Sequence, residues 1–251
     1  MGVMSQGCKA PKPRPRRNCI KAQAPQISQT QERAIDTFAI ERSLHSQGIC
    51  PVAGVDEAGR GPLAGPVVAA CVILPLECDY SPFRDSKLLS EKQRETLAAL
   101  LQENGAVYGL GLAEAEEIDA VNILQASLLA MKRAVEACSQ ANKGLMPECL
   151  LVDGSFAVPL PLAQQTLVRG ESQSASIAAA SILAKVHRDH LMAALHAQFH
   201  CYGWLQNKGY PTRAHRQAIA DHGPCPQHRQ SFKGVREYSD FAGGNSKPRL
   251  G

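Results

Sequence analysis

Apolar positions along the chain fall into short runs that predict the strands of a sheet. The first run leads from Val52 to the acidic residue Asp56, and after a glycine-rich turn residues 66–74 are almost wholly apolar. This order predicts strand, turn, strand. Similar runs predict three further strands, at residues 107–112, at residues 149–153 and near Leu167.

Helical spacing of apolar residues occupies most of the intervals between these runs. Ser90 followed by Gln93 is a capping-box pattern, which predicts a helix to about Gln102. Apolar positions three and four residues apart predict other helices at residues 30–47, 121–137 and 174–199. Acidic residues at 114–117 precede the second of these, where the helix dipole favours negative charge. Strands followed by alternating strands and helices predict an α/β core with a mixed sheet.

Composition then divides the chain into four segments. Residues 1–28 combine prolines with like charges and predict a disordered basic tail, whereas residues 29–49 predict a short helix and linker. Residues 50–200 form the predicted core. A chain of 251 residues with 44% hydrophobic positions has enough apolar side chains for one core of this size. Residues 201–251, rich in Gly, Pro, His and Arg, predict a small helical and loop segment with a flexible end.

The net charge of +4 is distributed unevenly along the chain. Residues 1–48 and 201–251 each contain eight Lys and Arg against three Asp and Glu, whereas residues 49–200 contain eleven against seventeen. This pattern suits an acidic site that needs cations, flanked by basic segments that neutralise phosphates. Basic ends that merely aid solubility explain the charges equally well.

Several other classes of protein fit the sequence poorly. The nine cysteines include no Cys-x-x-Cys pair, and Cys225 with His228 falls short of four ligands, so neither a disulfide framework nor a zinc site is expected. No apolar run approaches the roughly 18 residues of a membrane helix, and the first residues are polar and basic. We therefore expect a soluble cytoplasmic protein without a membrane partner.

Carboxylates follow three of the apolar segments. Asp56 and Glu57 follow Val55, Asp153 ends the strand at 149–153, and Glu171 follows the short strand near 167. Acids at strand ends can converge at one edge of a sheet, where only cations make such a cluster tolerable. Hard oxygen ligands favour Mg²⁺ or Mn²⁺, and two such ions can drive phosphodiester cleavage. Taken singly, each acid also fits an ordinary role in a turn, a helix cap or a polar strand end.

The adjacency of Asp56 and Glu57 poses a geometrical problem. Neighbouring residues of a regular strand face opposite sides of the sheet. Both carboxylates can serve one site only if the chain kinks there, and Gly54, Gly59 and Gly61 provide the conformational freedom for a kink.

The amino-acid sequence of a longer stretch resembles that of a known protein family. Residues 55–68, from Val-Asp-Glu-Ala-Gly-Arg-Gly to Pro-Val-Val, closely resemble the opening motif of ribonuclease HII, the type 2 ribonucleases H. Further blocks that resemble the family, in family order, lie at residues 85–90, 118–124, 152–154, 178–186, 208–212 and 228–232. The resemblance covers about residues 50–236. It implies a ribonuclease H-like fold, with a mixed central sheet flanked by helices and a small helical C-terminal part.

The resemblance also implies an activity. It points to a monomeric endonuclease that uses two Mg²⁺ or Mn²⁺ ions to cleave RNA in RNA–DNA hybrids and at single ribonucleotides in duplex DNA. Cleavage would fall 5′ to the ribonucleotide and leave 3′-hydroxyl and 5′-phosphate ends. Asp56, Glu57 and Asp153 match three of the family's four metal-binding acids, which are also its catalytic residues. Glu171 stands where the family usually has aspartate, and Asp189 competes with it or supports the site from behind.

Substrate contacts are implied in the same way. The Gly59-Arg60-Gly61 segment would sense the 2′-hydroxyl of one ribonucleotide, because glycines allow close approach to a sugar and arginine can bind a phosphate through two donors. Tyr210 would pack against the sugar on the DNA side of the junction. Phosphate contacts are implied for Lys87 and Lys185, and Lys208, Arg213 and Arg229 would extend the basic surface.

Two other functions remain open at this point. One is a broader hybrid nuclease that resembles ribonuclease HIII, and the other is a catalytically silent protein that binds hybrids. The Gly-Arg-Gly segment and Tyr210 favour the junction-type enzyme over the first. The intact acids Asp56, Glu57 and Asp153 argue against the second.

Overall fold

A five-stranded mixed sheet forms the centre of the protein in a computed structural model, which describes residues 36–77, 80, 83 and 89–238. All of these residues belong to one unit of the chain that begins at Ile35. The predicted tail at 1–28, Lys87 and the predicted flexible end at 239–251 lie outside the described residues.

The strand order of the sheet is β3-β2-β1-β4-β5. The central strand β1 (Val52–Ala58) pairs antiparallel with β2 (Val67–Ile73) and parallel with β4 (Cys149–Asp153). Beyond them, β3 (Val107–Ala113) runs antiparallel to β2, and β5 (Ala163–Leu167) runs parallel to β4. The mixed α/β core predicted from the apolar pattern is confirmed.

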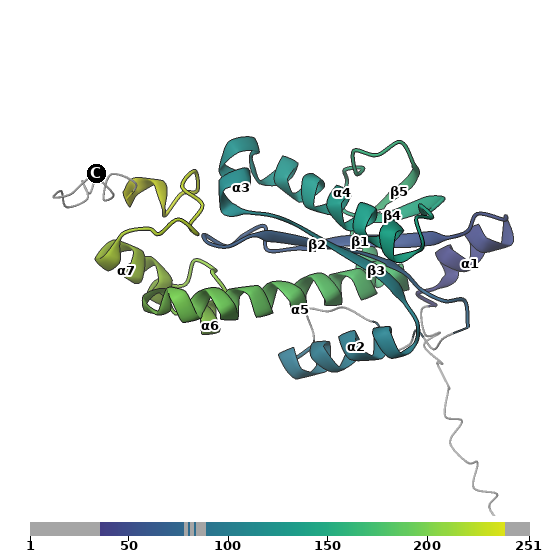
Figure 1. The fold of residues 1–251 in the computed structure, drawn as a ribbon, viewed down its shortest axis with the longest axis horizontal. Helices are drawn as coiled ribbons and strands as arrows, with labels where there is room; N and C mark the ends of the chain where they lie inside the picture. The colour runs from purple at the N-terminus through teal and green to yellow at the C-terminus, as the bar shows by residue number, and fades with distance from the viewer. Residues whose placement is uncertain (1–35, 78–79, 81–82, 84–88, 239–251) are drawn as a thin grey trace, which may run out of the picture. The chain divides into compact units, whose positions relative to one another are not determined.

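Helices cover both faces of the sheet (Figure 1). On one face α4 (Ile123–Ala141) packs across β3, β2 and β1, and α3 (Ala115–Val121) packs against α4. On the other face α5 (Ala175–Gln198) crosses β1 and β2, and α2 (Glu91–Glu103) packs outside it. The first described helix, α1 (Ala39–Ser46), lies against β1. In the part of the chain that the structure describes, no helix combines the length and apolarity needed to cross a membrane.

Successive residues of β2 supply two separate hydrophobic cores. Ala69 and Cys71 belong to the core beneath α4, whereas Ala70 and Val72 belong to the core beneath α5 and α2. All four side chains are fully buried, as the period of two along a strand requires when helices cover both faces. Close helix contact also needs Gly109, because a Cβ there would lie 2.1 Å from the backbone nitrogen of residue 138 in α4.

The C-terminal part forms a third core beside one end of the sheet. The helices of the C-terminal part are the short helices η3 (His200–Tyr202) and α6 (Trp204–Asn207), followed by α7 (Arg213–His222). Trp204 is fully buried there and packs with Leu63 from the loop between β1 and β2. The C-terminal part is therefore joined to the loop that follows the first strand, as a site shared between them requires.

Two predicted helices differ from those observed. The acidic residues that were expected to precede one long helix instead open a separate helix, α3, through a capping box between Glu114 and Glu117. Asn122 ends α3 with φ +73°, and its side chain then caps α4 by accepting from the N–H groups of residues 124 and 125. The helix predicted at 30–47 begins only at Ala39 within the described residues.

Candidate active site

The adjacent acids of β1 lie on a regular strand. Asp56 is paired with Ala70 and Glu57 with Ala69, and the ladder continues one residue further without a break. The kink expected from the neighbouring glycines is therefore wrong for these two positions. Ala70 lies in the core beneath α5 and Ala69 in the core beneath α4, so the two acids start toward opposite faces near the end of the strand.

The other two predicted acids lie on neighbouring elements. Asp153 is the last residue of β4, which runs parallel to β1, and its Oδ1 accepts a hydrogen bond of 2.7 Å from the Gly170 N–H. Gly170 opens the short helix η2 (Gly170–Ser172), which contains the buried Glu171. Ser181 of α5 donates to Glu171 Oε2 at 3.4 Å. The sheet edge and α5 thus bring the predicted acids into one region.

Electrostatic coupling shows how close three of these acids are. Burial raises the pKa of Asp56 well above its usual range, and the charges of Glu57 and Asp153 raise it further. Burial also raises the pKa of Glu57, an effect that the neighbouring Arg60 opposes and the charge of Asp153 strengthens. The charge of Asp153 thus opposes the ionisation of both acids of β1, and a bound cation would relieve that repulsion.

The donor atoms fit a divalent cation, although they do not form a complete ligand set as they stand. Within the part of the chain that the structure describes, Glu57 Oε2 is buried without a hydrogen-bond partner, while its Oε1 is 3.2 Å from Arg60 Nη1. Among the described residues, no three His, Cys, Asp or Glu side chains are grouped so that they could hold a metal ion. Asp153 and Glu171 each accept a hydrogen bond from a protein donor.

The predicted ribose sensor, Gly59-Arg60-Gly61, is a turn that packs against two buried arginines, Arg188 and Arg229. Gly59 adopts φ +97°, and a Cβ there would lie 2.0 Å from the Nε atom of Arg188. The Arg229 guanidinium donates to the carbonyls of Gly59 at 2.6 Å, Arg60 at 2.9 Å and Gly65 at 2.9 Å. Both guanidinium side chains are fully buried, whereas the Arg60 side chain is half exposed. The turn therefore presents Arg60 outward from a fixed backbone.

The expected role of Arg229 in the basic surface is thus wrong. Burial, and then the charge of Arg188, lower the pKa of Arg229 to about 9, so its guanidinium remains charged at neutral pH. A buried arginine of this kind is surrounded by carbonyl groups that only the folded chain assembles. In the sequence, the only sign of a special role for Arg229 is its place in the family block at 228–232. Arg188 lies in none of the family blocks, so its buried role has no sign in the sequence.

Tyr210 lies beside the Gly59–Gly61 turn. It is 42% exposed, and a Cβ added at Gly61 would lie 3.8 Å from its ring. The Arg188 guanidinium is 5.9 Å from the centre of the same ring. The preceding residue, Gly209, accepts a hydrogen bond of 2.8 Å from the Leu63 N–H, which ties this turn to the loop after β1. Segments about 150 residues apart in the sequence therefore meet beside the acids of β1.

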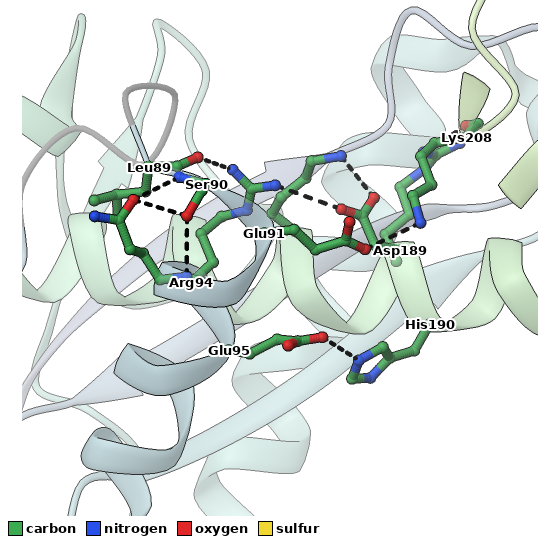
Figure 2. Close-up of polar contacts among 11 residues, drawn as sticks. Leu89, Ser90, Glu91, Arg94, Glu95, Asp189, His190 and Lys208 are labelled. Carbon is green, nitrogen blue, oxygen red and sulfur yellow. Dashed lines mark hydrogen bonds and ion pairs between the residues drawn. The ribbon is translucent and has the colours of Figure 1, made fainter. Parts of the chain in front are cut away.

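Asp189 points toward Arg94 of α2 (Figure 2). Its carboxylate is buried, with Oδ1 2.6 Å from Lys185 Nζ and Oδ2 3.8 Å from Arg94 Nη2. Arg94 also donates to the Leu89 carbonyl ahead of α2. Asp189 thus joins α5 to α2 as an ion-paired residue, which favours the supporting role over direct metal binding. The pair also fixes the position of Lys185, whose side chain is 26% exposed.

The remaining cations expected on the surface differ in exposure. Lys208 donates to Glu91 at the start of α2 at 3.1 Å, with only 14% of its side chain exposed (Figure 2). Its backbone, with φ +48°, offers its carbonyl to Arg188. Arg213 is exposed at the start of α7. Lys208 therefore braces the turn before Tyr210, and Arg213 is free to contribute to a basic surface.

Cys225 and His228 belong to a buried hydrogen-bonded cluster. His228 Nδ1 accepts from the Cys225 N–H at 3.0 Å, which leaves its Nε2–H to donate to His215 Nε2 at 3.2 Å. Trp204 Nε1–H donates to the same His215 atom at 3.0 Å, and His215 Nδ1–H donates to the Tyr210 carbonyl at 3.0 Å. Both rings are therefore neutral, and the cluster supports the backbone of Tyr210.

The sheet order, the helices on both faces and the acids at the ends of adjacent parallel strands define a ribonuclease H-like fold. The family model for ribonuclease HII matches residues 53–235. A ribonuclease HII from Desulfotalea psychrophila is 56% identical over 207 residues, which cover 82% of this chain and 91% of the relative. The chain belongs to the ribonuclease HII family.

Solved structures agree with this fold. Ribonuclease H2 from Pyrococcus horikoshii matches with a TM-score of 0.59 and 24% identity, covering 77% of this chain and 99% of that one. Bst-RNase HIII in complex with Mn²⁺ matches with a TM-score of 0.64 and 19% identity, covering 80% and 73%. Family membership makes the chain a ribonuclease H, an endonuclease and hydrolase of a metal-dependent class that acts on RNA–DNA hybrids.

Proposed function

We propose that this ribonuclease H cleaves RNA in RNA–DNA hybrids and at single ribonucleotides embedded in duplex DNA. The cut falls 5′ to the ribonucleotide and leaves 3′-hydroxyl and 5′-phosphate ends. The enzyme acts as a monomer in the cytoplasm, with Mg²⁺ or Mn²⁺ as its cofactor. The observation that carries the proposal is the meeting of the Gly59–Gly61 turn with Tyr210 beside the coupled acids of β1 and β4.

The four acids form the catalytic part of the proposed site. Asp56, Glu57 and Asp153 are the metal-binding carboxylates, with Glu171 as the fourth. The bound ions would supply a reactive water and stabilise the leaving oxygen. Burial raises the pKa of both Asp56 and Glu57, so a bound cation would favour their ionised forms. The unpartnered Glu57 Oε2 is one available donor.

Substrate selection belongs to the neighbouring turns. The fixed backbone of Gly59, Arg60 and Gly61 approaches the ribose and reads its 2′-hydroxyl, while the outward guanidinium of Arg60 binds a phosphate. The exposed Tyr210 ring packs against the adjacent deoxyribose and excludes a second 2′-hydroxyl. Lys185, and Lys87 outside the described residues, bind the phosphate backbone.

A cleavage assay with three duplexes tests this function. One duplex carries a single ribonucleotide in DNA, one is an RNA–DNA hybrid, and one is DNA alone, each with Mg²⁺ or Mn²⁺. We expect cutting 5′ to the single ribonucleotide and within the hybrid, with DNA left intact. Cutting of the hybrid alone would instead indicate the broader hybrid nuclease, and binding without cutting would indicate a silent hybrid-binding protein.

A further inference from the structure

A buried carboxylate outside the acid cluster holds the first turn of α5. Glu41 of α1 is 1% exposed, and its Oε1 accepts from Ser174 Oγ at 2.6 Å, Ser176 Oγ at 2.7 Å and the Ser176 N–H at 3.0 Å. The Thr37 carbonyl accepts from the Ala175 N–H at 2.7 Å. Residues ahead of β1 therefore satisfy N–H groups that a helix start leaves without partners, and they place a negative charge at its positive end.

This turn of α5 touches two of the three backbone segments that carry the proposed acids. A Cβ at Gly54, two residues before the first acid of β1, would lie 2.1 Å from the carbonyl carbon of Ser176. A Cβ at Gly170, directly before Glu171, would lie 2.6 Å from Ile177 Cδ1. The first turn of α5 is thus wedged between β1 and η2 with no spare room. Its position sets the separation of the two segments.

The same helix carries a side chain that contacts the acids themselves. The Ser181 hydroxyl, further along α5, has one proton to donate, either to Glu171 Oε2 at 3.4 Å or to Asp56, where its hydrogen bond opposes the rise in pKa. A helix is stiff over this length, so a shift or rotation at the first turn displaces Ser181 along with it. Glu41 is therefore linked to two of the proposed metal-binding acids through one rigid element.

We propose that Glu41 is a positioning residue of the active site, which sets the placement of α5 and, through it, the geometry of Asp56 and Glu171. The inference rests on the function proposed above. It assigns part of the active-site scaffold to α1, which precedes the region 53–235 matched by the family model. The second oxygen of Glu41 is buried without a partner among the described residues, so the carboxylate stays there at an energetic cost.

Three variants test the role of Glu41. Glu41→Ala removes every contact, and we expect kcat on an RNA–DNA hybrid to fall about tenfold or more, because small displacements at a catalytic centre are costly. KM for the duplex should change less than about twofold, since no contact of Glu41 reaches the substrate surface. Mn²⁺ affinity of the free protein, measured by calorimetry, should fall in parallel. Glu41→Gln keeps one acceptor oxygen and should recover part of both losses.

The controls separate positioning from stability. Glu148→Gln alters an exposed acid that accepts a single backbone hydrogen bond, from Cys50, and should leave kcat and Mn²⁺ affinity unchanged. If Glu41→Ala fails to fold, Ser176→Ala removes one Glu41 contact while Ser174 still caps α5. Unchanged kcat and Mn²⁺ affinity in variants that only melt earlier would overturn the proposal. Absence of cutting by the unmodified enzyme would refute the proposed function, while the Mn²⁺ comparison would still decide the role of Glu41.

Discussion

At the scale of single residues, Asp56 is an acid of the site whose ionisation the surroundings strongly oppose. It is 6% exposed and faces α5, and its ionisation is opposed first by burial and then by the charges of Glu57 and Asp153. A protein gains nothing in stability from such an acid, because a neutral side chain of the same shape would avoid the repulsion. A cation bound during the proposed function would explain its presence.

Asp56→Asn should abolish cleavage while duplex binding stays nearly the same. The amide keeps the shape of the side chain but cannot supply a negative oxygen ligand, so kcat should fall by about a thousandfold or more. Binding measured by fluorescence anisotropy without metal should change less than about twofold, since phosphate contacts lie on other residues. The same change should raise thermal stability, and an active Asp56→Asn enzyme would remove Asp56 from the mechanism.

Glu171 should tolerate shortening better than removal. Its carboxylate already accepts a hydrogen bond from Ser181, and aspartate at this position keeps the charge and matches the usual family residue. We expect Glu171→Asp to retain activity within about threefold and Glu171→Ala to lose about a hundredfold in kcat. Single-turnover cleavage rates at saturating Mg²⁺ measure both. Equal rates for the alanine variant and the parent would contradict a role for Glu171 in metal binding.

At the scale of elements, Arg229 turns a loop into a rigid part of the site. Its guanidinium donates to the carbonyls of Gly59 and Arg60 within the turn and of Gly65 after it. Arg188 fills the space that a side chain at Gly59 would need. Neither arginine reaches the substrate surface, since both are fully buried. The proposed selectivity for a ribonucleotide would thus depend on residues that do not touch it.

Arg229→Met should impair recognition more than the chemical step. The carbonyls of Gly59, Arg60 and Gly65 would lose their donor, and the free energy of unfolding should fall by about 2 to 4 kcal/mol. With the turn loosened, KM on the single-ribonucleotide duplex should rise about tenfold or more, and the preference over plain DNA should shrink. Arg213→Met, which alters an exposed arginine of α7, serves as the control and should keep that preference.

At the scale of the whole molecule, the sequence predicts the fold more completely than it predicts the contacts of the site. Runs ending at Asp56 and Asp153 predict strands because burial on both faces demands continuous apolar residues, and these strands lie where expected. The split at Asn122 was missed because its positive φ depends on local hydrogen bonds rather than on apolar period. The buried contacts of Arg229 and Glu41 join segments more than 100 residues apart, which no local pattern encodes.

Acid should destabilise the molecule through its buried histidine pair. Burial, and then the charge of His215, lower the pKa of His228 from 6.5 to about 3, and burial lowers that of His215 as well. A depressed histidine pKa gives stability that is complete above about pH 6.5 and is lost as pH falls toward 3. At pH 5 His228 alone should cost about 2 kcal/mol relative to neutral pH.

Urea unfolding between pH 5 and 8 measures this loss. Asp56 has a raised pKa, so its contribution has the opposite sign and fades as pH rises, and an Asp56→Asn background removes it. In that background His228→Asn should flatten the pH dependence, whereas His200→Gln, at an exposed position, should leave it unaltered. A slope that survives His228→Asn would show that other groups are responsible.

The bonds from Arg229 to the Gly59–Gly61 turn also bear on how the enzyme is made. All four proposed acids have been synthesised once residue 171 has been added, but the turn has no donor for its carbonyls until residue 229 leaves the ribosome. A nascent or truncated chain that ends before this arginine can contain the sheet and its acids without a formed ribose sensor. Translation past Arg229 is then needed before this turn is fixed, so we expect chains that end earlier to lack the proposed preference for a ribonucleotide.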